Sequence, residues 1–245
     1  EGDETRVTFR LRLPAGAASH RIEAVASTGG KQYRASFDPI TYAGLETLYH
    51  SEPAAHTLAV VDVKIAHGLR AGYVMGSGDE VPEALRQLGV DVTMLNASDL
   101  ATADLSRFHV ILLGIRAYAA RPDVKTHNVR LLEYVNKGGV LIVQYNTQEY
   151  DNNYGPYPYT MTQRAEEISE EDSPVKILAP DHPVFRTPNA ITAADFDNWV
   201  EQRGSKFWMT WDSRYTPLLE TQDNGQAPQR GGWLEAKHGK GLYVY

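Results

Sequence analysis

Hydrophobic residues in the middle of the chain are concentrated in three short runs, residues 71–75, 110–113 and 140–143, that contain no charged side chain. A strand with one wet face would alternate apolar and polar residues. Uninterrupted runs therefore predict strands that are covered on both faces. A fourth run, residues 90–95, does alternate, and we expect it nearer an edge of the same sheet.

Two segments between these runs carry the helical period instead. In each segment the apolar residues return to one face of a helix, and a glycine that can end the helix follows them. The sets are Val81, Ala84, Leu85 and Leu88 before Gly89, and Val124, Leu131, Leu132 and Val135 between Pro122 and Gly138. Strands that alternate with helices predict an α/β fold with a parallel sheet and right-handed crossovers.

Residues 1–67 follow a different period. Val7, Phe9, Leu11 and Leu13 alternate with polar residues, residues 22–26 and 58–65 read as further strands, and Gly29-Gly30 predicts a hairpin turn. With so few strands we expect part of a β-sandwich, joined at residues 66–68 to an α/β domain that covers residues 68–245. Both ends of the chain read as strand, so we expect a piece of a longer polypeptide that is truncated after residue 245.

The pattern weakens after residue 146. Residues 149–159 are rich in tyrosine and turn formers, which indicates a long loop over the carboxyl edge of the sheet. We expect a short strand at 174–178 and a short helix at 192–199 that Thr192 caps, with Asp195 in its first turn. Antiparallel strands are predicted at 206–211, 217–221, 232–237 and 242–245.

Composition removes several classes of function. A formal charge of −7 and a pI near 5.6 argue against nucleic acid and anionic membranes as partners, and no apolar run is long enough to span a bilayer. The absence of cysteine excludes disulfides, thiolate zinc sites and cysteine nucleophiles. The eight histidines form neither H-x-x-H nor H-E-x-x-H, so we expect no metal and no other cofactor.

Ligands of parallel sheets bind beyond the carboxyl ends of the strands. The turns at that edge supply amides and a helix start for an anion, a guanidinium for a carboxylate, phosphate or sugar hydroxyl pair, an aromatic face and two side-chain amides. The candidate ligand-binding residues are Gly76, Ser77, Gly78, Asp79, Arg116, Tyr118, Gln144 and Asn146.

Each of these signals has a plainer interpretation. The 76–79 segment fails the dinucleotide-binding pattern and reads equally as a tight turn in which Asp79 or Ser77 caps the helix. Arg116 can pair with Asp79 or Asp123 and lock its loop. No Gly-x-Ser-x-Gly elbow occurs, so we assign no catalytic residue. Sugar stacking or buried packing explains the aromatic residues Tyr150, Tyr154, Tyr157, Tyr159, Trp199, Trp208 and Trp211.

The segments V-M-G-S-G-D-E-V-P-E-A-L-R-Q-L-G, G-I-R-A-Y, L-L-E-Y-V-N-K-G-G-V-L-I-V-Q-Y-N-T and I-T-A-A-D-F-D-N-W-V resemble the C-terminal portion of large bacterial PIG-L (LmbE-like) deacetylases, over nearly all of residues 40–245. The resemblance implies a zinc-dependent N-deacetylase domain upstream, a β-sandwich, and a flavodoxin-like, class I glutamine-amidotransferase-like domain. It also implies an extracytoplasmic location. The family's P-H-P-D-D and His-x-x-His motifs are missing here, so no deacetylase residue carries over.

That amidotransferase fold places a cysteine on an elbow after a central strand, which we expect at Val143-Gln144-Tyr145. The resemblance therefore favours a non-catalytic accessory region, which binds a glycan or another small polar ligand or supports the other domains of the same polypeptide. Two alternatives stay open: a hydrolase in which Asp79, Arg116 and Gln144 line the pocket, and a pure interaction module.

Overall fold

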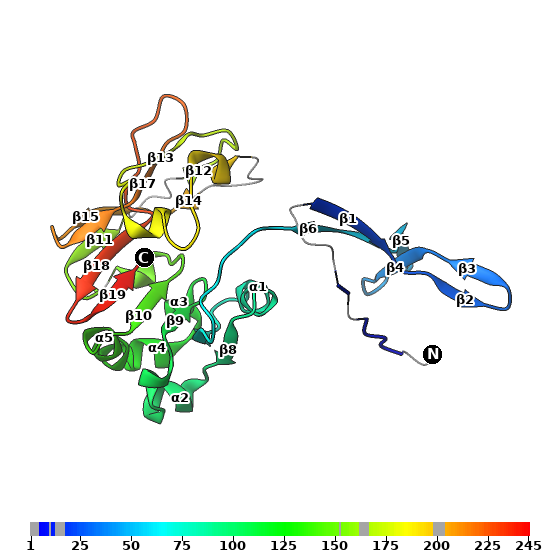
Figure 1. The fold of residues 1–245 in the computed structure, drawn as a ribbon, viewed down its shortest axis with the longest axis horizontal. Helices are drawn as coiled ribbons and strands as arrows, with labels where there is room; N and C mark the ends of the chain where they lie inside the picture. The colour runs from blue at the N-terminus through cyan, green and yellow to red at the C-terminus, as the bar shows by residue number, and fades with distance from the viewer. Residues whose placement is uncertain (1–4, 10, 13–17, 152, 162–166, 198–203) are drawn as a thin grey trace. The chain divides into compact units, whose positions relative to one another are not determined.

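The computed structural model describes residues 5–9, 11–12, 18–151, 153–161, 167–197 and 204–245. The chain divides into two compact units, Glu1–Val63 and Lys64–Tyr245 (Figure 1). This division falls a few residues before the junction expected at 66–68. Each unit is described by itself.

The first unit consists of two-stranded antiparallel ladders. They pair β1 (Ala18–Glu23) with β6 (Ala55–Val60), β2 (Ala26–Thr28) with β3 (Lys31–Tyr33), and β4 (Ala35–Ile40) with β5 (Leu48–Pro53). Gly29 and Gly30 have φ of 56° and 77°, the left-handed pair that a tight hairpin turn requires, so the predicted turn is confirmed.

The expected sandwich is absent from the described part of this unit. Residues 5–9 and 11–12 form no strand, and Val7, Phe9 and Leu11 are exposed; Leu13 lies outside the described residues. None of the described side chains up to Val63 is buried. The alternation at residues 7–11 therefore produces no buried face in the described residues, and a sandwich needs a second sheet to face the first, which separate ladders do not supply.

The second unit is a mixed α/β structure built on a seven-stranded sheet. The strand order is β16-β18-β19-β10-β9-β7-β8. The parallel strands are β7 (Arg70–Val74), β8 (Asp91–Met94), β9 (Val110–Leu113), β10 (Val140–Val143) and β19 (Gly241–Val244), and the antiparallel ones are β16 (Tyr215–Pro217) and β18 (Leu234–His238).

Two strand predictions are confirmed and one is corrected. The three apolar runs form β7, β9 and β10 in the parallel part of the sheet, and the alternating run forms the edge strand β8. The last strand was expected in an antiparallel set, but β19 pairs in parallel with β10 and is antiparallel to β18 alone. Its small and apolar residues suit this interior position.

The helices are short. They are α1 (Val81–Gln87), α2 (Ala97–Thr102), α3 (Ala117–Ala120), α4 (Pro122–Thr126) and α5 (Asn128–Asn136). The helix predicted after Pro122 is thus interrupted at His127, whose φ and ψ of −102° and 14° leave the helical region. None of the helices in the described residues is long and apolar enough to cross a membrane.

The two faces of the sheet are covered differently. The larger core lies on the face of the sheet that carries Ile111, Leu113 and Leu141. Helices α2, α4 and α5 contribute Leu100, Val124, Leu131 and Val135 to it. On the other face α1 covers β7 through Val81 and Leu85. Only half of its predicted apolar face is covered, because Ala84 and Leu88 are exposed.

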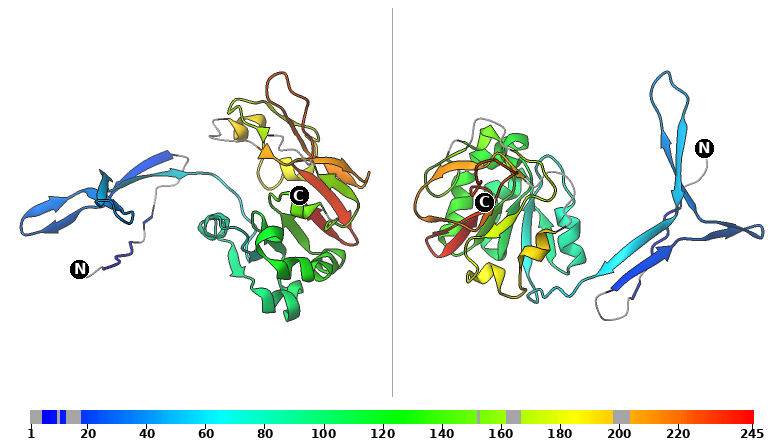
Figure 2. Two further views of the ribbon diagram at one scale, coloured as in Figure 1. Left: turned by 180° about the vertical axis from the view of Figure 1, so that it is seen from behind. Right: turned by 90° about the horizontal axis from the view of Figure 1, so that it is seen from above.

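A cap of small antiparallel ladders completes the unit. It pairs β11 (Tyr159–Met161) with β15 (Trp208–Trp211), β12 (Glu167–Ile168) with β14 (Gly204–Ser205), and β13 (Val175–Ile177) with β17 (Leu219–Thr221). In the left view of Figure 2 these yellow to orange segments gather at the opposite end from the green helices α2 to α5. Short 3₁₀ turns lie at Leu105–Arg107 (η1), Gln148–Tyr150 (η2), Pro183–Phe185 (η3) and Ala193–Phe196 (η4), the last with the predicted Thr192–Asp195 capping pair.

Buried Asp223 ties the cap together. Its carboxylate accepts hydrogen bonds from the Ser169 amide at 3.0 Å, the Glu170 amide at 3.2 Å and the Ser173 hydroxyl at 2.7 Å. Burial raises the pKa of Asp223, but these donors outweigh it and lower that pKa to about 2. Asp223 therefore stays ionised and holds the segment after β12 against the segment after β17.

Candidate functional site

The three turns that were predicted to share the carboxyl edge do meet. The Ser77 amide donates to the Ile115 carbonyl at 2.8 Å, and the Arg116 amide donates to the Tyr145 carbonyl at 2.7 Å. Gly76 lies so close that a Cβ there would stand 2.0 Å from the Ile115 oxygen. Because β7 has β8 on one side and β9 on the other, the winding of the chain reverses here, which is where open α/β sheets bind ligands.

A polar cluster lies at the end of β7. The Tyr73 hydroxyl donates to Asp79 Oδ1 at 2.6 Å, and Gln144 Nε2 donates to the Tyr73 oxygen at 2.9 Å. The cluster packs on Gly114, where a Cβ would lie 2.8 Å from Asp79 Oδ2 and 2.9 Å from the Tyr73 oxygen. Burial, and then Asp79, raise the pKa of Tyr73 well above its ordinary value, so the phenol remains protonated and keeps donating.

Asp79 has a part of the expected capping role. Its Oδ1 also accepts from the Val81 amide at 3.1 Å, at the start of α1. Its Oδ2 is buried and has no hydrogen-bond partner within the described residues. Ser77 and Gly78, in contrast, are exposed at the turn itself. The turn at residues 76–79 is therefore partly structural, because the Ser77 amide is already bonded to the Ile115 carbonyl.

Arg116 occupies a strained position. Its φ and ψ of 54° and 31° are left-handed, and it begins α3 without capping it through its side chain. The guanidinium is 48% exposed and lies 3.8 Å from the Glu149 carboxylate. Burial raises the pKa of Glu149, but the Thr147 hydroxyl and nearby amides, with Arg116 last, lower it on balance.

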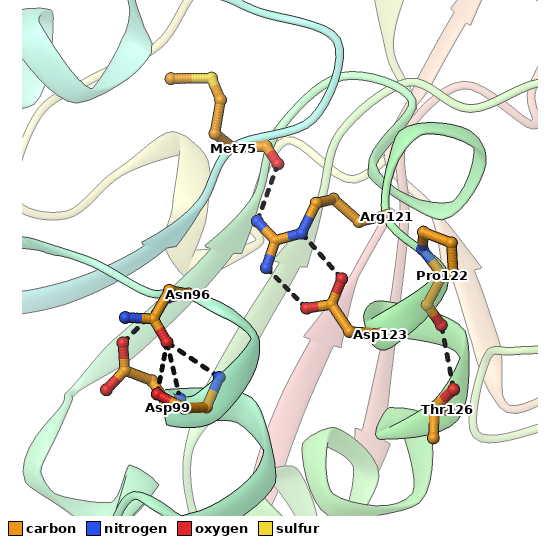
Figure 3. A network of polar contacts seen from close by, with 8 residues as sticks. Met75, Asn96, Asp99, Arg121, Pro122, Asp123 and Thr126 are labelled. Atoms are coloured by element: carbon orange, nitrogen blue, oxygen red, sulfur yellow. Dashed lines mark hydrogen bonds and ion pairs between the residues drawn. The ribbon is translucent and has the colours of Figure 1, made fainter.

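The alternative in which Arg116 pairs with Asp79 or Asp123 is wrong, because Asp123 pairs with Arg121 instead. Arg121 donates to both oxygens of Asp123, at 2.8 and 2.6 Å, and reaches the Met75 carbonyl at 3.5 Å, as Figure 3 shows. The sequence signal for this pair is the Arg-Pro-Asp order at residues 121–123, which sets the two side chains two positions apart.

The sharp strand-to-helix turn lies after β9, not after β10. The expectation of an elbow at Val143-Gln144-Tyr145 is therefore wrong: β10 runs on into an extended segment before η2, whereas the chain turns directly from β9 into α3 at Arg116. The physical cause is tertiary, because the Tyr145 carbonyl and Gly76 hold the Ile115-Arg116 peptide in place. The residue at this strand-to-helix turn is thus Arg116, which carries a positive charge.

Two of the candidate residues are structural. Tyr118 and Asn146 are both fully buried. The Tyr118 hydroxyl donates to Asn128 Oδ1 at 2.6 Å, and Asn146 Nδ2 donates to the Gln144 carbonyl at 2.8 Å. Neither side chain is available to a ligand at the surface.

The tyrosine-rich loop packs inward as well. Tyr150 and Tyr159 are buried, and Trp208 stacks on Tyr159 with ring centroids 3.8 Å apart and planes at 11°. Burial raises the pKa of Tyr150 far above its ordinary value. These rings offer no free face to a sugar, whereas Trp199 lies outside the described residues. Packing under a long loop explains the aromatic pattern here.

A cavity of about 620 Å³ lies beyond the carboxyl ends of β10 and β19, between the sheet and the cap. Its volume is typical of small-molecule sites. Apolar side chains form most of the wall: Ile115, Ile142, Val143, Val175, Phe196, Phe207, Leu219, Trp233, Val244 and Tyr245. Polar groups enter from Gln144, Ser205, Lys206, Thr221 and Gln229.

Of the eight candidate ligand-binding residues, all of which the structure describes, Gln144 alone lines this cavity. It joins the cavity to the Tyr73–Asp79 cluster, while Arg116 follows the wall residue Ile115 directly in the chain. No group of three or more histidine, aspartate or glutamate residues suited to a metal ion occurs in the described parts of the chain.

No model of a protein family matches the chain, and no curated protein matches it. Among solved structures, it is similar to a ThuA-like protein from Bacteroides uniformis ATCC 8492, with 13% identity and a TM-score of 0.44 over 76% of this chain and 84% of that one. It is also similar to Gan42B, a GH42 β-galactosidase, with 13% identity and a TM-score of 0.41 over 71% of this chain and 26% of that one. Neither similarity assigns an activity to this chain.

Proposed function

We propose that residues 64–245 form a non-catalytic ligand-binding domain of the amidotransferase-like α/β type, whose ligand occupies the cavity at the carboxyl edge of the sheet. The order of the parallel strands, β8-β7-β9-β10-β19, supports the fold assignment, because flavodoxin-like sheets follow this order. The resemblance to PIG-L deacetylases makes the domain an accessory region of such an extracytoplasmic enzyme, next to a zinc-dependent domain elsewhere in the polypeptide.

The cavity is the observation that carries this proposal. It holds about 620 Å³, opens at the edge where parallel sheets bind ligands, and sets a few polar groups into an apolar wall. Such a wall favours a ligand with a substantial apolar face over a purely polar one. A sugar ring that stacks on Phe207 or Trp233 meets this requirement, as does a lipid-like or aromatic molecule.

The contacts at the edge favour binding over hydrolysis. The elbow that would present a nucleophile carries Arg116, whose guanidinium cannot attack a substrate. The hydrolase alternative needs Asp79 and Gln144 to act on a substrate, but Gln144 Nε2 and Asp79 Oδ1 are bonded to the Tyr73 hydroxyl, and Asp79 does not line the cavity. A hollow rather than a flat apolar surface also favours a small molecule over a docked protein.

The test is a fluorescence titration of the 245-residue chain with N-phenyl-1-naphthylamine, a neutral dye that brightens in apolar cavities. Val244 lines the cavity, whereas Val140 lies on the same face of the sheet outside it. Val244→Phe should fill part of the cavity and weaken dye binding about tenfold or more, a loss of about 1.4 kcal/mol. Val140→Phe adds the same ring and should leave the affinity unchanged.

Two outcomes would overturn the proposal: no saturable binding of the dye, or equal binding by the two valine variants. Thermal unfolding of both variants checks that the chain still folds, since overpacking costs about 1–3 kcal/mol. Once the cavity is established, N-acetylated aryl glycosides can be titrated as competitors of the dye, which tests the glycan form of the proposal separately.

A further inference from the structure

Lys206 is the charged residue of the cavity wall. The described lining residues include no other lysine or arginine and no aspartate or glutamate. Lys206 is half-buried, and within the described residues its ammonium group has neither an ion pair nor a hydrogen bond. In a chain with a net charge of −7, an unpaired cation on an apolar wall calls for an anion in the cavity.

The backbone at Lys206 is strained. Its φ is 55°, a left-handed value shared, among the described non-glycine residues, by Arg116 and Asn153. Asparagine adopts this region readily, but lysine does not. Strain of this kind persists where the surroundings dictate it, and it is concentrated at functional sites.

The residues around Lys206 explain its left-handed backbone in part. A Cβ at Gly204 would lie 2.8 Å from the Phe207 ring, and a Cβ at Gly232 would lie 2.7 Å from it. Phe207 is therefore held between two glycines and forms part of the cavity wall. Placing this ring explains the turn, but it does not explain a lysine, because glycine would make the same turn without strain.

The cavity also contains an unused hydroxyl. Thr221 Oγ1 is buried and has no hydrogen-bond partner in the part of the chain that is described, although the backbone of Thr221 is paired with Gln229. Thr221 and Gln229 both line the cavity. Polar groups that are buried without partners are uncommon in proteins, so this hydroxyl indicates a polar atom of a bound molecule.

We infer that the cavity binds a small amphipathic anion, with its apolar body against the aromatic wall and its carboxylate, phosphate or sulfonate at Lys206. This inference rests on the proposed function and adds the chemical class of the ligand. A neutral sugar or a neutral lipid would leave the ammonium group without a partner. An amphipathic acid gives both parts of the cavity a complementary group.

The experiment compares two dyes with nearly the same rings in the 245-residue chain. 8-Anilinonaphthalene-1-sulfonate carries an anion, and N-phenyl-1-naphthylamine carries none. The unmodified chain should bind the sulfonate about tenfold more tightly than the neutral dye, as expected for one charge-assisted contact. Added sodium chloride should reduce this preference.

Three substitutions separate the charge from the backbone. Lys206→Met keeps the length of the side chain and Lys206→Gly releases the strained turn, so both should abolish the preference for the sulfonate while the neutral dye binds as before. Lys206→Arg should retain the preference. Lys176→Met is the control, because Lys176 lies in the cap, is 68% exposed and pairs with Glu220.

The two proposals fail in different ways. If both dyes bind with equal affinity, or if Lys206→Met and Lys206→Gly keep the preference, the inference about the anion is overturned and the cavity remains a binding site. If neither dye binds, or if Val244→Phe has no effect on either dye, the proposed function itself is overturned.

Discussion

The hydroxyl of Tyr73 lies 2.6 Å from Asp79 Oδ1, so a single short hydrogen bond connects the carboxyl end of β7 to the segment just before α1. Gln144 Nε2 adds a second bond to the same hydroxyl from the end of β10. One phenol thus connects the turn after β7 with the segment after β10, and of its two partners Gln144 lines the cavity whereas Asp79 does not. Asp79 and Tyr73 therefore support this edge of the sheet from outside the cavity.

Removing this phenol should destabilise the domain. Tyr73→Phe leaves Asp79 Oδ1 and Gln144 Nε2 each short of a partner, with an expected loss of about 1–3 kcal/mol. Urea unfolding followed by circular dichroism measures the change. Tyr157→Phe is the matched control, because that hydroxyl donates to the Lys237 carbonyl at an exposed position. Equal effects of the two substitutions would contradict the role given to Tyr73.

Adding a side chain at Gly114 should destabilise the domain. Gly114→Ala places a Cβ 2.8 Å from Asp79 Oδ2 and 2.9 Å from the Tyr73 oxygen, and overpacking of this kind costs about 1–3 kcal/mol. A double-mutant cycle with Tyr73→Phe checks the mechanism, since deleting the hydroxyl removes one of the three close contacts; those with Asp79 Oδ2 and the Gly76 amide nitrogen remain. We expect the double variant to be more stable than the sum of the single losses. Strict additivity would show that the two sites are independent.

Position 116 should prefer glycine to alanine. Arg116→Gly relieves a left-handed backbone that costs a residue with a Cβ about 1–2 kcal/mol, whereas Arg116→Ala keeps that cost. The exposed ion pair with Glu149 contributes little to either variant. Thermal unfolding of the pair gives the difference.

Arg86 provides the control for this comparison. It lies in α1, is 42% exposed and pairs loosely with Glu83 at 3.6 Å, much as Arg116 does with Glu149. Inside a helix the order should reverse, with Arg86→Gly about 1 kcal/mol less stable than Arg86→Ala. The same order at both positions would argue against a strained Arg116.

Acid should loosen the cap through Asp223. Its pKa in the folded chain is about 2, below the ordinary value of 3.8, so its carboxylate contributes stability above pH 3.8 that is lost as the pH falls toward 2. In Asp223→Asn this part of the pH dependence should be missing, and the variant should be less stable at neutral pH. Unfolding curves between pH 5 and about 2 test this. Asp181→Asn, at a carboxylate with 90% of its side chain exposed, should behave as the unmodified chain does.

Local sequence predicted the parts of the fold that depend on local chemistry. The apolar runs became β7, β9 and β10 because burial on both faces leaves no position for a polar residue. Gly29-Gly30 gave its hairpin turn, and Thr192 with Asp195 gave its cap. For the turn and the cap the decisive contact lies within a few residues, and for the three strands the local composition alone marks burial on both faces.

The site depends on contacts that no local pattern records. Arg116 is left-handed because Gly76 and the Tyr145 carbonyl hold it, and those partners lie in other turns. The cavity wall combines Ile142, Val175 and Phe207 with further residues from separate strands. Polarity at one edge of the sheet singles out the candidate residues, whereas the wall of the cavity is mostly apolar. The predicted convergence of the turns is confirmed, but no local pattern in the sequence predicts the apolar wall.

The stacked pair of Tyr159 and Trp208 gives the protein an optical signal of its own. Two aromatic chromophores held 3.8 Å apart with nearly parallel planes should couple and produce a strong near-ultraviolet circular dichroism band, which disappears when fixed tertiary packing is lost. Trp208 is buried in the core and does not line the cavity, so this band should report the packing of the core itself. Spectra of the unlabelled chain can then follow the loss of fixed tertiary packing without any added dye.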